Sequence, residues 1–244
     1  AIESVRKLAA GEIEADDFCQ SSPRPIEGMW VEIKNIIGSV KNEHLWAMLD
    51  RIFLLGQETS AKFKQAPAGK EVHHAFVGGL LLHTLEVVAY AEKMVELQGD
   101  QLDRDLLIAG CLLHDLGKIE EYEPRVPSFE FTDKGKLLGH LVIGAEIVGR
   151  AIDTLAGFPP LLRQELQHMI LSHHGMKEWG SPEEPKTANA MALHLADLTS
   201  GRLSQIEKII NEMKPLEERW SSWDKRLGRS IFIGYNGGGD NIEA

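Results

Sequence analysis

The sequence predicts an all-α protein with one main helical domain. Along most of the 244 residues, apolar side chains recur three and four positions apart, which places them on one face of a helix. Glycine or proline stands near an end of most of these stretches, as is typical of helix termini. Strand-like alternation is confined to residues 128–132 (SFEFT), which we expect to form one small hairpin arm before a turn at Gly135.

The helices can be placed in order along the chain. Residues 29–55 carry the pattern of two helices separated near Asn42, and residues 66–69 (APAG) are expected to form a turn. Further helices are predicted at 72–98, 103–116, 137–156, 159–174 and 187–213. The helical domain therefore covers residues 29–214.

Two flanking segments lack this pattern. Residues 1–28 are predicted to be a lead-in or linker, because SSPRP at 21–25 interrupts any helix. Residues 215–244 are predicted to be a polar C-terminal tail, with a flexible end at 237–240 (GGGD).

Composition narrows the class of protein. Hydrophobic residues make up 43% of the chain and charged residues 26%, which is ordinary for a globular protein. The formal net charge of -11 excludes a protein whose whole surface binds nucleic acid, so a polyanionic substrate would have to be held locally. Bound divalent cations would reverse the local effect of acidic ligands, so the negative sign is compatible with a phosphate substrate.

The expected compartment is a reducing cytoplasm. Cys19 and Cys111 are far apart and outside any CxxC motif, so neither a disulfide framework nor a zinc-thiolate site is indicated. No apolar run has the length of a membrane span, and the N-terminus lacks the pattern of a signal peptide.

Histidine and aspartate side chains occur on or beside the apolar stripes of five predicted helices. An ionised aspartate is almost never fully buried unless it is paired or bound to a metal ion, and a buried imidazole also needs polar partners. A single core histidine is more often structural than a metal ligand. The residues that we predict to converge as metal ligands are His83, His114, Asp115, His140, His173 and Asp197, and His174 lies beside them as the second histidine of a pair.

Five helices that each contribute such a group favour a shared site with one or two divalent cations. Burying these groups together without a cation would carry a large desolvation cost. Imidazole and carboxylate ligands suit Mn, Fe, Co, Ni or Zn, and Mg fits the more oxygen-rich position. Asp115 is the natural bridging ligand of a dinuclear site because it follows His114 directly.

This ordered series resembles the H…HD…H…H…D signature of the HD-domain superfamily of metal-dependent phosphohydrolases. Gly117 and Lys118 after the HD dipeptide strengthen the resemblance. Four stretches are also similar to the YhaM-type 3'-to-5' exoribonucleases, and the similarity covers about residues 60–210. They are residues 73–84 (HHAFVGGLLLHT), 137–140 (LLGH), 171–175 (LSHHG) and 178–182 (EWGSP).

The resemblance implies a helical bundle that hydrolyses phosphodiesters of single-stranded RNA with one or two ions, Mn first among them. One ion would be held by His83, His114, Asp115 and Asp197, and a second would be held or approached by Asp115, His140 and His173. Lys118 would face the substrate phosphate. Relatives of this type carry an N-terminal OB-fold, and we expect residues 1–28 to be at most a remnant of one.

The remaining catalytic roles follow from residue chemistry. A divalent ion makes a hydroxide from its bound water, and Lys118 adds a positive charge beside the phosphoryl oxygens. His174 or Asp115 is expected to act as general acid or base. Trp179 lies in a loop beside the histidine pair, where it either stacks on a base of the substrate or closes the core. His194, three residues before Asp197, either orients that carboxylate or packs.

Alternative functions remain open from sequence. The substrate could be a nucleotide, a cyclic nucleotide or another small phosphate ester instead of RNA. A non-catalytic nucleotide- or nucleic-acid-binding module is disfavoured because every ligand position is retained. A di-iron oxygenase would use the same ligand types, but Lys118 favours a phosphate. A homo-oligomer is compatible with all of these, and no membrane partner is expected.

Overall fold

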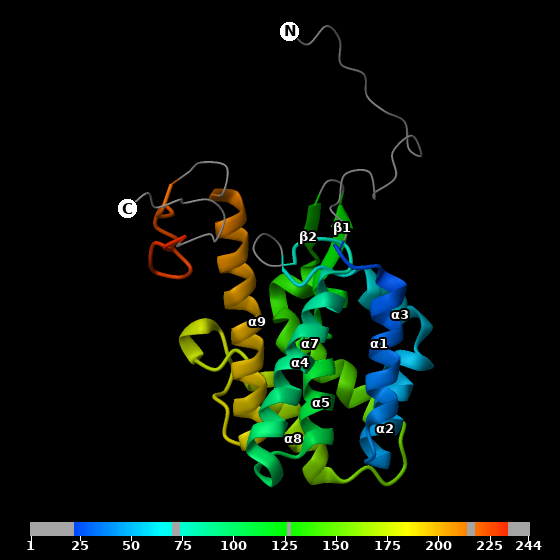
Figure 1. The fold of residues 1–244 in the computed structure, drawn as a ribbon. Coiled ribbons are helices and arrows are strands. Elements are labelled where there is room, and N and C mark those ends of the chain that lie inside the picture. Colours follow the sequence, from blue (N-terminus) through cyan, green and yellow to red (C-terminus); the bar gives the residue numbers. More distant parts are fainter. Residues whose placement is uncertain (1–21, 70–73, 126–127, 214–217, 234–244) are drawn as a thin grey trace, which may run out of the picture.

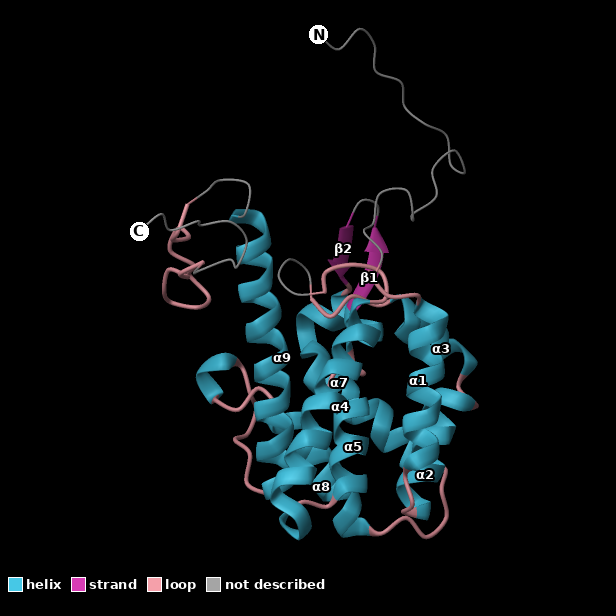
Figure 2. Ribbon diagram, in the orientation of Figure 1, coloured by secondary structure: helices cyan, strands magenta, loops and turns pink. Residues whose placement is uncertain are grey.

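The protein is a bundle of helices with one short hairpin at its end, as the ribbons show (Figures 1 and 2). The computed structural model describes residues 22–69, 74–125, 128–213 and 218–233. The all-α prediction is confirmed. Within these described ranges, no helix is both long and apolar enough to span a membrane. Residues 1–21, His73 and the glycine-rich stretch at 237–240 lie outside the described ranges.

The N-terminal helices are α1 (Ile26–Ser39), α2 (Glu43–Leu49), which continues into a π-helical turn (Asp50–Leu54), and α3 (Gln57–Gln65). The break predicted near Asn42 is confirmed, because the Asn42 side chain caps α2 by accepting the backbone N–H groups of His44 and Leu45. Helix α3 was not predicted. Phe63 is the one buried residue of this helix, so α3 lacks the apolar stripe from which the other helices were predicted.

Four helices form the centre of the bundle: α4 (Gly79–Gln98), α5 (Arg104–Leu113), α8 (Pro160–Ser172) and α9 (Ala188–Met213). Helix α4 packs against α5 and α9, and α8 also contacts both α5 and α9. This helix was predicted to start at residue 72, but residues 74–78 are not helical and α4 begins at Gly79. Gly78, directly before it, has a φ of 80°, which no α-helical residue adopts. The apolar stripes of these helices meet in one core that includes Leu81, Ile108 and Leu193.

The segment after α5 joins the bundle to the hairpin. Helix α5 ends at Leu113, and a turn over residues 114–117 leads into the short helix α6 (Lys118–Glu121). Strands β1 (Tyr122–Arg125) and β2 (Ser128–Phe131) then pair antiparallel, with Tyr122 opposite Phe131. The hairpin is confirmed, but the turn expected at Gly135 is not, because Gly135 lies in the first turn of α7.

Helix α7 (Asp133–Asp153) is interrupted at Gly139, whose φ of 71° is not helical. This break sets the start of the second helical stretch at His140. Close by, a Cβ atom added to Gly117 would lie 2.0 Å from the carbonyl oxygen of His140, so only glycine allows the two backbones to approach this closely. The two glycines therefore place His140 beside the turn that carries Asp115.

The C-terminal segment 218–233 is folded, although it belongs to the stretch predicted as a polar tail. Isolated antiparallel bridges join Trp220 to Phe232 and Asp224 to Arg229. Ser221 and Ile233 are buried. The segment lies beside the C-terminal half of α9 (Figure 1).

Candidate metal centre and its cleft

The Asp115 carboxylate lies at the centre of the histidine cluster and is only 3% exposed. Its Oδ2 atom is 3.5 Å from Nε2 of His83 and 3.4 Å from Nε2 of His114. Its Oδ1 atom is 3.4 Å from Nε2 of His140 and 3.6 Å from Nε2 of His173. The two carboxylate oxygens thus face two different pairs of imidazole rings.

Asp197 of α9 completes the first group. Its Oδ1 atom is 3.1 Å from Nε2 of His83 and 3.9 Å from Nε2 of His114, while these two ring nitrogens are 3.3 Å apart. Helices α4 and α9 and the turn after α5 therefore bring His83, His114, Asp115 and Asp197 to one point, although more than 100 residues separate the first from the last.

His174 belongs to the second group. Its Nε2 atom is 3.2 Å from Nε2 of His140, and one nitrogen from each of His140, His173 and His174 lies close enough to hold the same ion. Sequence analysis placed His174 as an acid or base beside the ligands. The geometry instead puts it among the groups that could ligate an ion.

The outer ring nitrogens are held by hydrogen bonds. Nδ1 of His114 donates to the carbonyl oxygen of Cys111, and Nδ1 of His173 donates to that of Ile170, both at 2.8 Å. A carbonyl can only accept, so Nδ1 carries the proton and Nε2 keeps a lone pair that points into the cluster. Nδ1 of His140 is likewise 3.0 Å from the Glu121 carboxylate. This is the usual arrangement around metal-binding histidines.

His83 is oriented by a chain of two polar residues. The Ser200 hydroxyl donates to Oε2 of Glu86 at 2.7 Å. Its oxygen is 3.0 Å from Nδ1 of His83 and therefore accepts from that ring. His74 contacts the same Glu86 oxygen at 3.1 Å. Sequence analysis missed Glu86 and Ser200, although each lies three residues after a predicted ligand on the same helix.

Burial sets the protonation of the imidazoles. Desolvation lowers the pKa of His83 and of His173 below the usual value. Desolvation, with repulsion from His173 and His140, lowers the pKa of His174 to about 3. For His114, burial acts in the same direction, but the Asp115 carboxylate outweighs it and raises the pKa. At neutral pH most of the cluster is thus in the uncharged form that binds metal ions.

The carboxylates stay ionised. Burial alone would raise the pKa of Asp115, but the positive charges of Lys118 and His114 hold it well below its usual range. Burial likewise opposes ionisation of Asp197, and its contact with His83 outweighs that effect and lowers its pKa. Two ionised carboxylates beside the uncharged rings of His83, His173 and His174 form a strongly cation-attracting site.

The surroundings of Asp115 Oδ1 indicate whether these residues fit divalent ions. Asp115 Oδ1 is buried and accepts no hydrogen bond from any residue in the described ranges. A buried carboxylate oxygen without a partner is costly. It faces ring nitrogens whose lone pairs point at it, so a cation between them would satisfy all of these groups together. The donor set of imidazole and carboxylate fits a first-row divalent ion.

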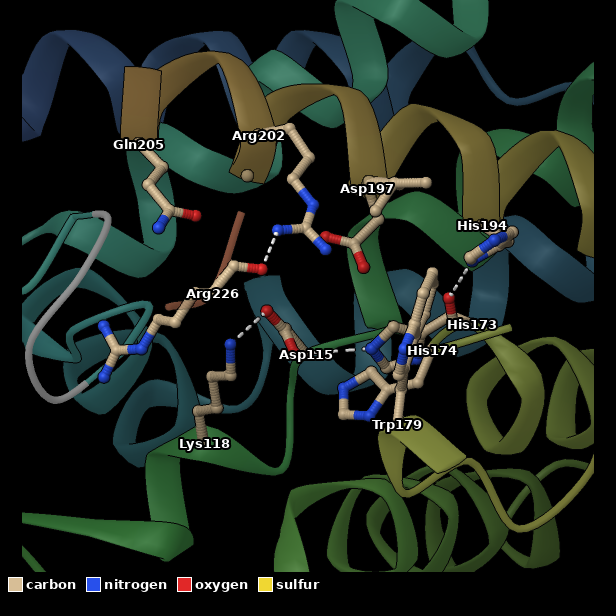
Figure 3. Close-up of a pocket in the computed structure, with 12 residues that line it drawn as sticks. Asp115, Lys118, His173, His174, Trp179, His194, Asp197, Arg202, Gln205 and Arg226 are labelled. Atoms are coloured by element: carbon tan, nitrogen blue, oxygen red, sulfur yellow. Dashed lines mark hydrogen bonds and ion pairs between the residues drawn. The ribbon is translucent and has the colours of Figure 1, made fainter. Parts of the chain in front are cut away.

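A cleft of about 460 Å³ opens on one side of the cluster. Lys118 lies in it with Nζ 2.6 Å from Asp115 Oδ2, and it also donates to the carbonyl oxygen of Ala68. Trp179, 47% exposed, lies at its edge near the His194 ring. The close-up shows these groups around Asp115 (Figure 3). The lining is Asp115, Lys118, His173, His174, Trp179, His194, Asp197, Leu198, Gly201, Arg202, Gln205 and Arg226.

The cleft also contains groups that sequence analysis assigned differently or missed. Nδ1 of His194 is 2.8 Å from the His173 carbonyl oxygen, so His194 supports the backbone of His173. Among the described residues no hydrogen bond joins His194 to Asp197, and orienting that carboxylate was one of the two roles left open for it. Arg202, Gln205 and Arg226 were missed, because charged and amide residues beyond the ligand motif resemble ordinary surface positions.

Comparisons with known proteins agree with this geometry. Residues 80–201 match the HD domain family. The 3'-5' exoribonuclease YhaM of Shouchella clausii is 35% identical over 230 residues, which cover 92% of this chain and 70% of that protein. The YhaM proteins of Bacillus subtilis (34% over 220 residues, 88% and 67%) and Listeria monocytogenes (35% over 230 residues, 92% and 71%) are similar. No solved structure matches the chain significantly.

The matched HD region contains the turn with His114 and Asp115 as well as the other candidate ligands from His83 to Asp197. The exoribonuclease relatives share about a third of their residues with the chain across most of its length. The chain therefore belongs to the HD-domain family of metal-dependent phosphohydrolases and, within it, to the group of YhaM 3'-5' exoribonucleases.

Proposed function

We propose that the chain removes nucleotides from the 3' end of single-stranded RNA by metal-dependent hydrolysis of phosphodiester bonds. The observation that carries this proposal is the Asp115 carboxylate, whose two oxygens face separate groups of ring nitrogens. A carboxylate placed in this way suits a site with two cations, which is a common arrangement in nucleases and phosphatases. The names of the relatives supply the substrate class.

One ion would be held by His83, His114, Asp197 and Asp115 Oδ2. A second would be held by His140, His173, His174 and Asp115 Oδ1, in contrast to the acid or base role predicted for His174. Mixed imidazole and carboxylate ligands suit a first-row divalent ion; manganese is the first candidate, and Fe, Co, Ni, Zn or Mg are the others. When bound, the ions supply a nucleophilic hydroxide and neutralise charge on the phosphoryl oxygens.

The protein groups around the cluster have distinct roles. Lys118 places a positive charge in the cleft beside Asp115, where it would bind a non-bridging oxygen of the scissile phosphate. Asp115 remains ionised, as a carboxylate that would bridge two cations must be, and its low pKa makes it a poor acceptor for the proton of the attacking water. His174 is in its uncharged form at neutral pH because its pKa is about 3, which argues against a general acid and for a ligand.

Trp179 is the candidate contact to a base. Nearly half of its surface is exposed at the edge of the cleft. A flat aromatic ring in this place could stack on any base, which suits an exonuclease that removes nucleotides regardless of sequence.

The direct test uses 5'-labelled single-stranded RNA with Mn²⁺ and the purified protein. We expect a ladder of products that shorten from the 3' end. A parallel panel of mononucleotides and cyclic nucleotides should be hydrolysed much more slowly. Rapid loss of phosphate from the small esters without any RNA ladder would favour the nucleotide phosphohydrolase. No turnover of either class under any metal would favour a binding module.

A further inference from the structure

The C-terminal segment 218–233 differs in charge from the rest of the protein. It contains four basic residues, at 219, 225, 226 and 229, against two acidic ones, at 218 and 224, whereas the whole chain has a net charge of -11. Trp220, Trp223 and Phe232 in this segment are each more than half exposed. Basic side chains interleaved with exposed aromatic rings are typical of surfaces that bind single-stranded nucleic acid.

Hydrogen bonds hold this segment against α9 just past the metal cluster. Oδ1 of Asp224 accepts the backbone N–H groups of Arg226 (2.9 Å) and Leu227 (2.7 Å). The same atom accepts Nε2 of Gln205 at 2.9 Å. Arg202 Nη1 donates to the carbonyl oxygen of Arg226, also at 2.9 Å. Two residues of α9 thus tie down the turn that carries Arg226.

This turn brings Arg226 to the cleft that contains the metal cluster. Arg202 and Arg226 both line the cleft together with Asp115 and Asp197. Among the described residues of its lining, these two aspartates are the only carboxylates, and both are proposed ligands. Figure 3 shows the two arginines on the side opposite Trp179 and His194. That side of the cleft is therefore suited to a further anionic group of the substrate.

We infer that Arg202 and Arg226 form a subsite for the backbone phosphate that neighbours the scissile one in a bound RNA strand. This inference rests on the proposed function and adds the feature that would separate a polynucleotide from a mononucleotide, since only the former has a second phosphodiester. A guanidinium group matches the oxygens of a phosphate with paired hydrogen bonds. Both residues lie beyond the matched HD region, which ends at residue 201.

Arg226→Ala is the test variant, with Arg229→Ala as its matched control. Arg229 lies in the same turn and is also exposed, but it does not line the cleft. Each variant is assayed with Mn²⁺ on an eight-nucleotide oligoadenylate and on bis(4-nitrophenyl) phosphate, a diester without a second phosphate. We expect Arg226→Ala to lower kcat/KM for the oligonucleotide about tenfold or more. Hydrolysis of the small diester, and both activities of Arg229→Ala, should change less than about twofold.

The dependence of KM on salt gives a readout that local structural damage would not mimic. Loss of one phosphate contact to a single strand should reduce the slope of log affinity against log salt by about 0.7. Arg226→Lys should keep this slope, because its charge remains, while it loses part of the affinity.

The outcomes separate this inference from the proposed function. If the parent protein shortens RNA and Arg226→Ala matches Arg229→Ala in kcat/KM and salt slope, the subsite is wrong and the exonuclease stands. Equal losses on both substrates in Arg226→Ala would also overturn the subsite. If the parent protein hydrolyses the small diester but never shortens RNA, the proposed function fails and the subsite fails with it.

Discussion

The histidine cluster around Asp115 and the rim of its cleft differ in burial and in the kind of segment that carries their side chains. In the cluster, His83, His114 and His173 are at most 1% exposed. Each of these rings has an outer nitrogen hydrogen-bonded to a carbonyl or hydroxyl oxygen. At the rim, Trp179 and Arg226 are exposed and belong to segments outside the long helices.

This difference assigns the two regions different tasks. Packed helices hold ligands to within fractions of an ångström, as metal coordination requires, because core side chains have few alternative rotamers. Exposed loops and turns tolerate sequence change, and they commonly carry the contacts that select a substrate. Substitutions in the cluster should therefore abolish chemistry, while substitutions at the rim should change the preference among substrates.

Asp115→Asn should have the largest effect, because it weakens both groups of ligands at once. We expect kcat on RNA to fall by at least about a thousandfold, comparable to loss of a central group in other active sites. The metal content, measured by mass spectrometry after dialysis, should also fall. Circular dichroism checks the fold, since Lys118 loses its charged partner. Near-normal turnover with full metal content would show that Asp115 is not the bridging group.

Ser200→Ala tests the support beneath a ligand. Without the hydroxyl, the His83 ring loses its link to Glu86, and we expect affinity for Mn²⁺ to fall by about 10- to 100-fold in calorimetric titrations. Thr199→Ala is the matched control, because Thr199 is the half-buried neighbour on α9 and, among the described residues, its hydroxyl donates to the carbonyl oxygen of Leu195 and not to the cluster. Equal affinities for the two variants would mean that Ser200 merely packs.

The pH dependence of stability isolates the His174 site. Its folded pKa of about 3 lies below the unfolded value of about 6.5, so its contribution is complete above pH 6.5 and is lost as the pH falls toward 3. The metal-free parent should lose up to about 1.4 kcal/mol more unfolding free energy per pH unit in that window than His174→Asn. Urea unfolding at pH 7, 6 and 5 measures this difference. Parallel curves would contradict a buried, uncharged His174.

Trp179→Ala should have the smallest effect and should act on the substrate alone. Loss of one stacked base predicts about a fivefold or larger rise in KM for RNA, with little change for a small diester. Trp46→Ala is the control, because Trp46 is exposed to a similar extent on α2 and does not line the cleft. An unchanged KM would indicate that Trp179 only covers the core.

The helices and the clustering of the histidine and aspartate series could be predicted from the sequence, because both depend on local pattern. Apolar periodicity locates a helix such as α5 directly, and polar groups on its apolar stripe, such as His114, must be buried. Helix α3 was not predicted, because a single buried aromatic residue does not produce an apolar repeat along the sequence. The contact of His174 with His140 could not be predicted, because the two histidines of the pair at 173–174 point in different directions and only the position of His140 shows where each ring lies.

The arginines at the rim of the cleft could not be predicted from the sequence, and the physical reason is a different one. Arg202 and Arg226 are 24 positions apart, and their contact depends on a turn that Asp224 stabilises through backbone N–H groups. Nothing in the local pattern distinguishes such an arginine from a solvated surface charge. Arg226 therefore appeared in the sequence as part of a polar tail, and Arg202 as an ordinary surface position of the helix predicted at 187–213.

The most direct measurement is anomalous diffraction at the manganese edge from crystals grown with Mn²⁺. We expect a peak on each side of the Asp115 carboxylate, one beside His83, His114 and Asp197 and the other beside His140, His173 and His174. Manganese bound only away from Asp115, or no manganese among these side chains at saturating Mn²⁺, would contradict this prediction.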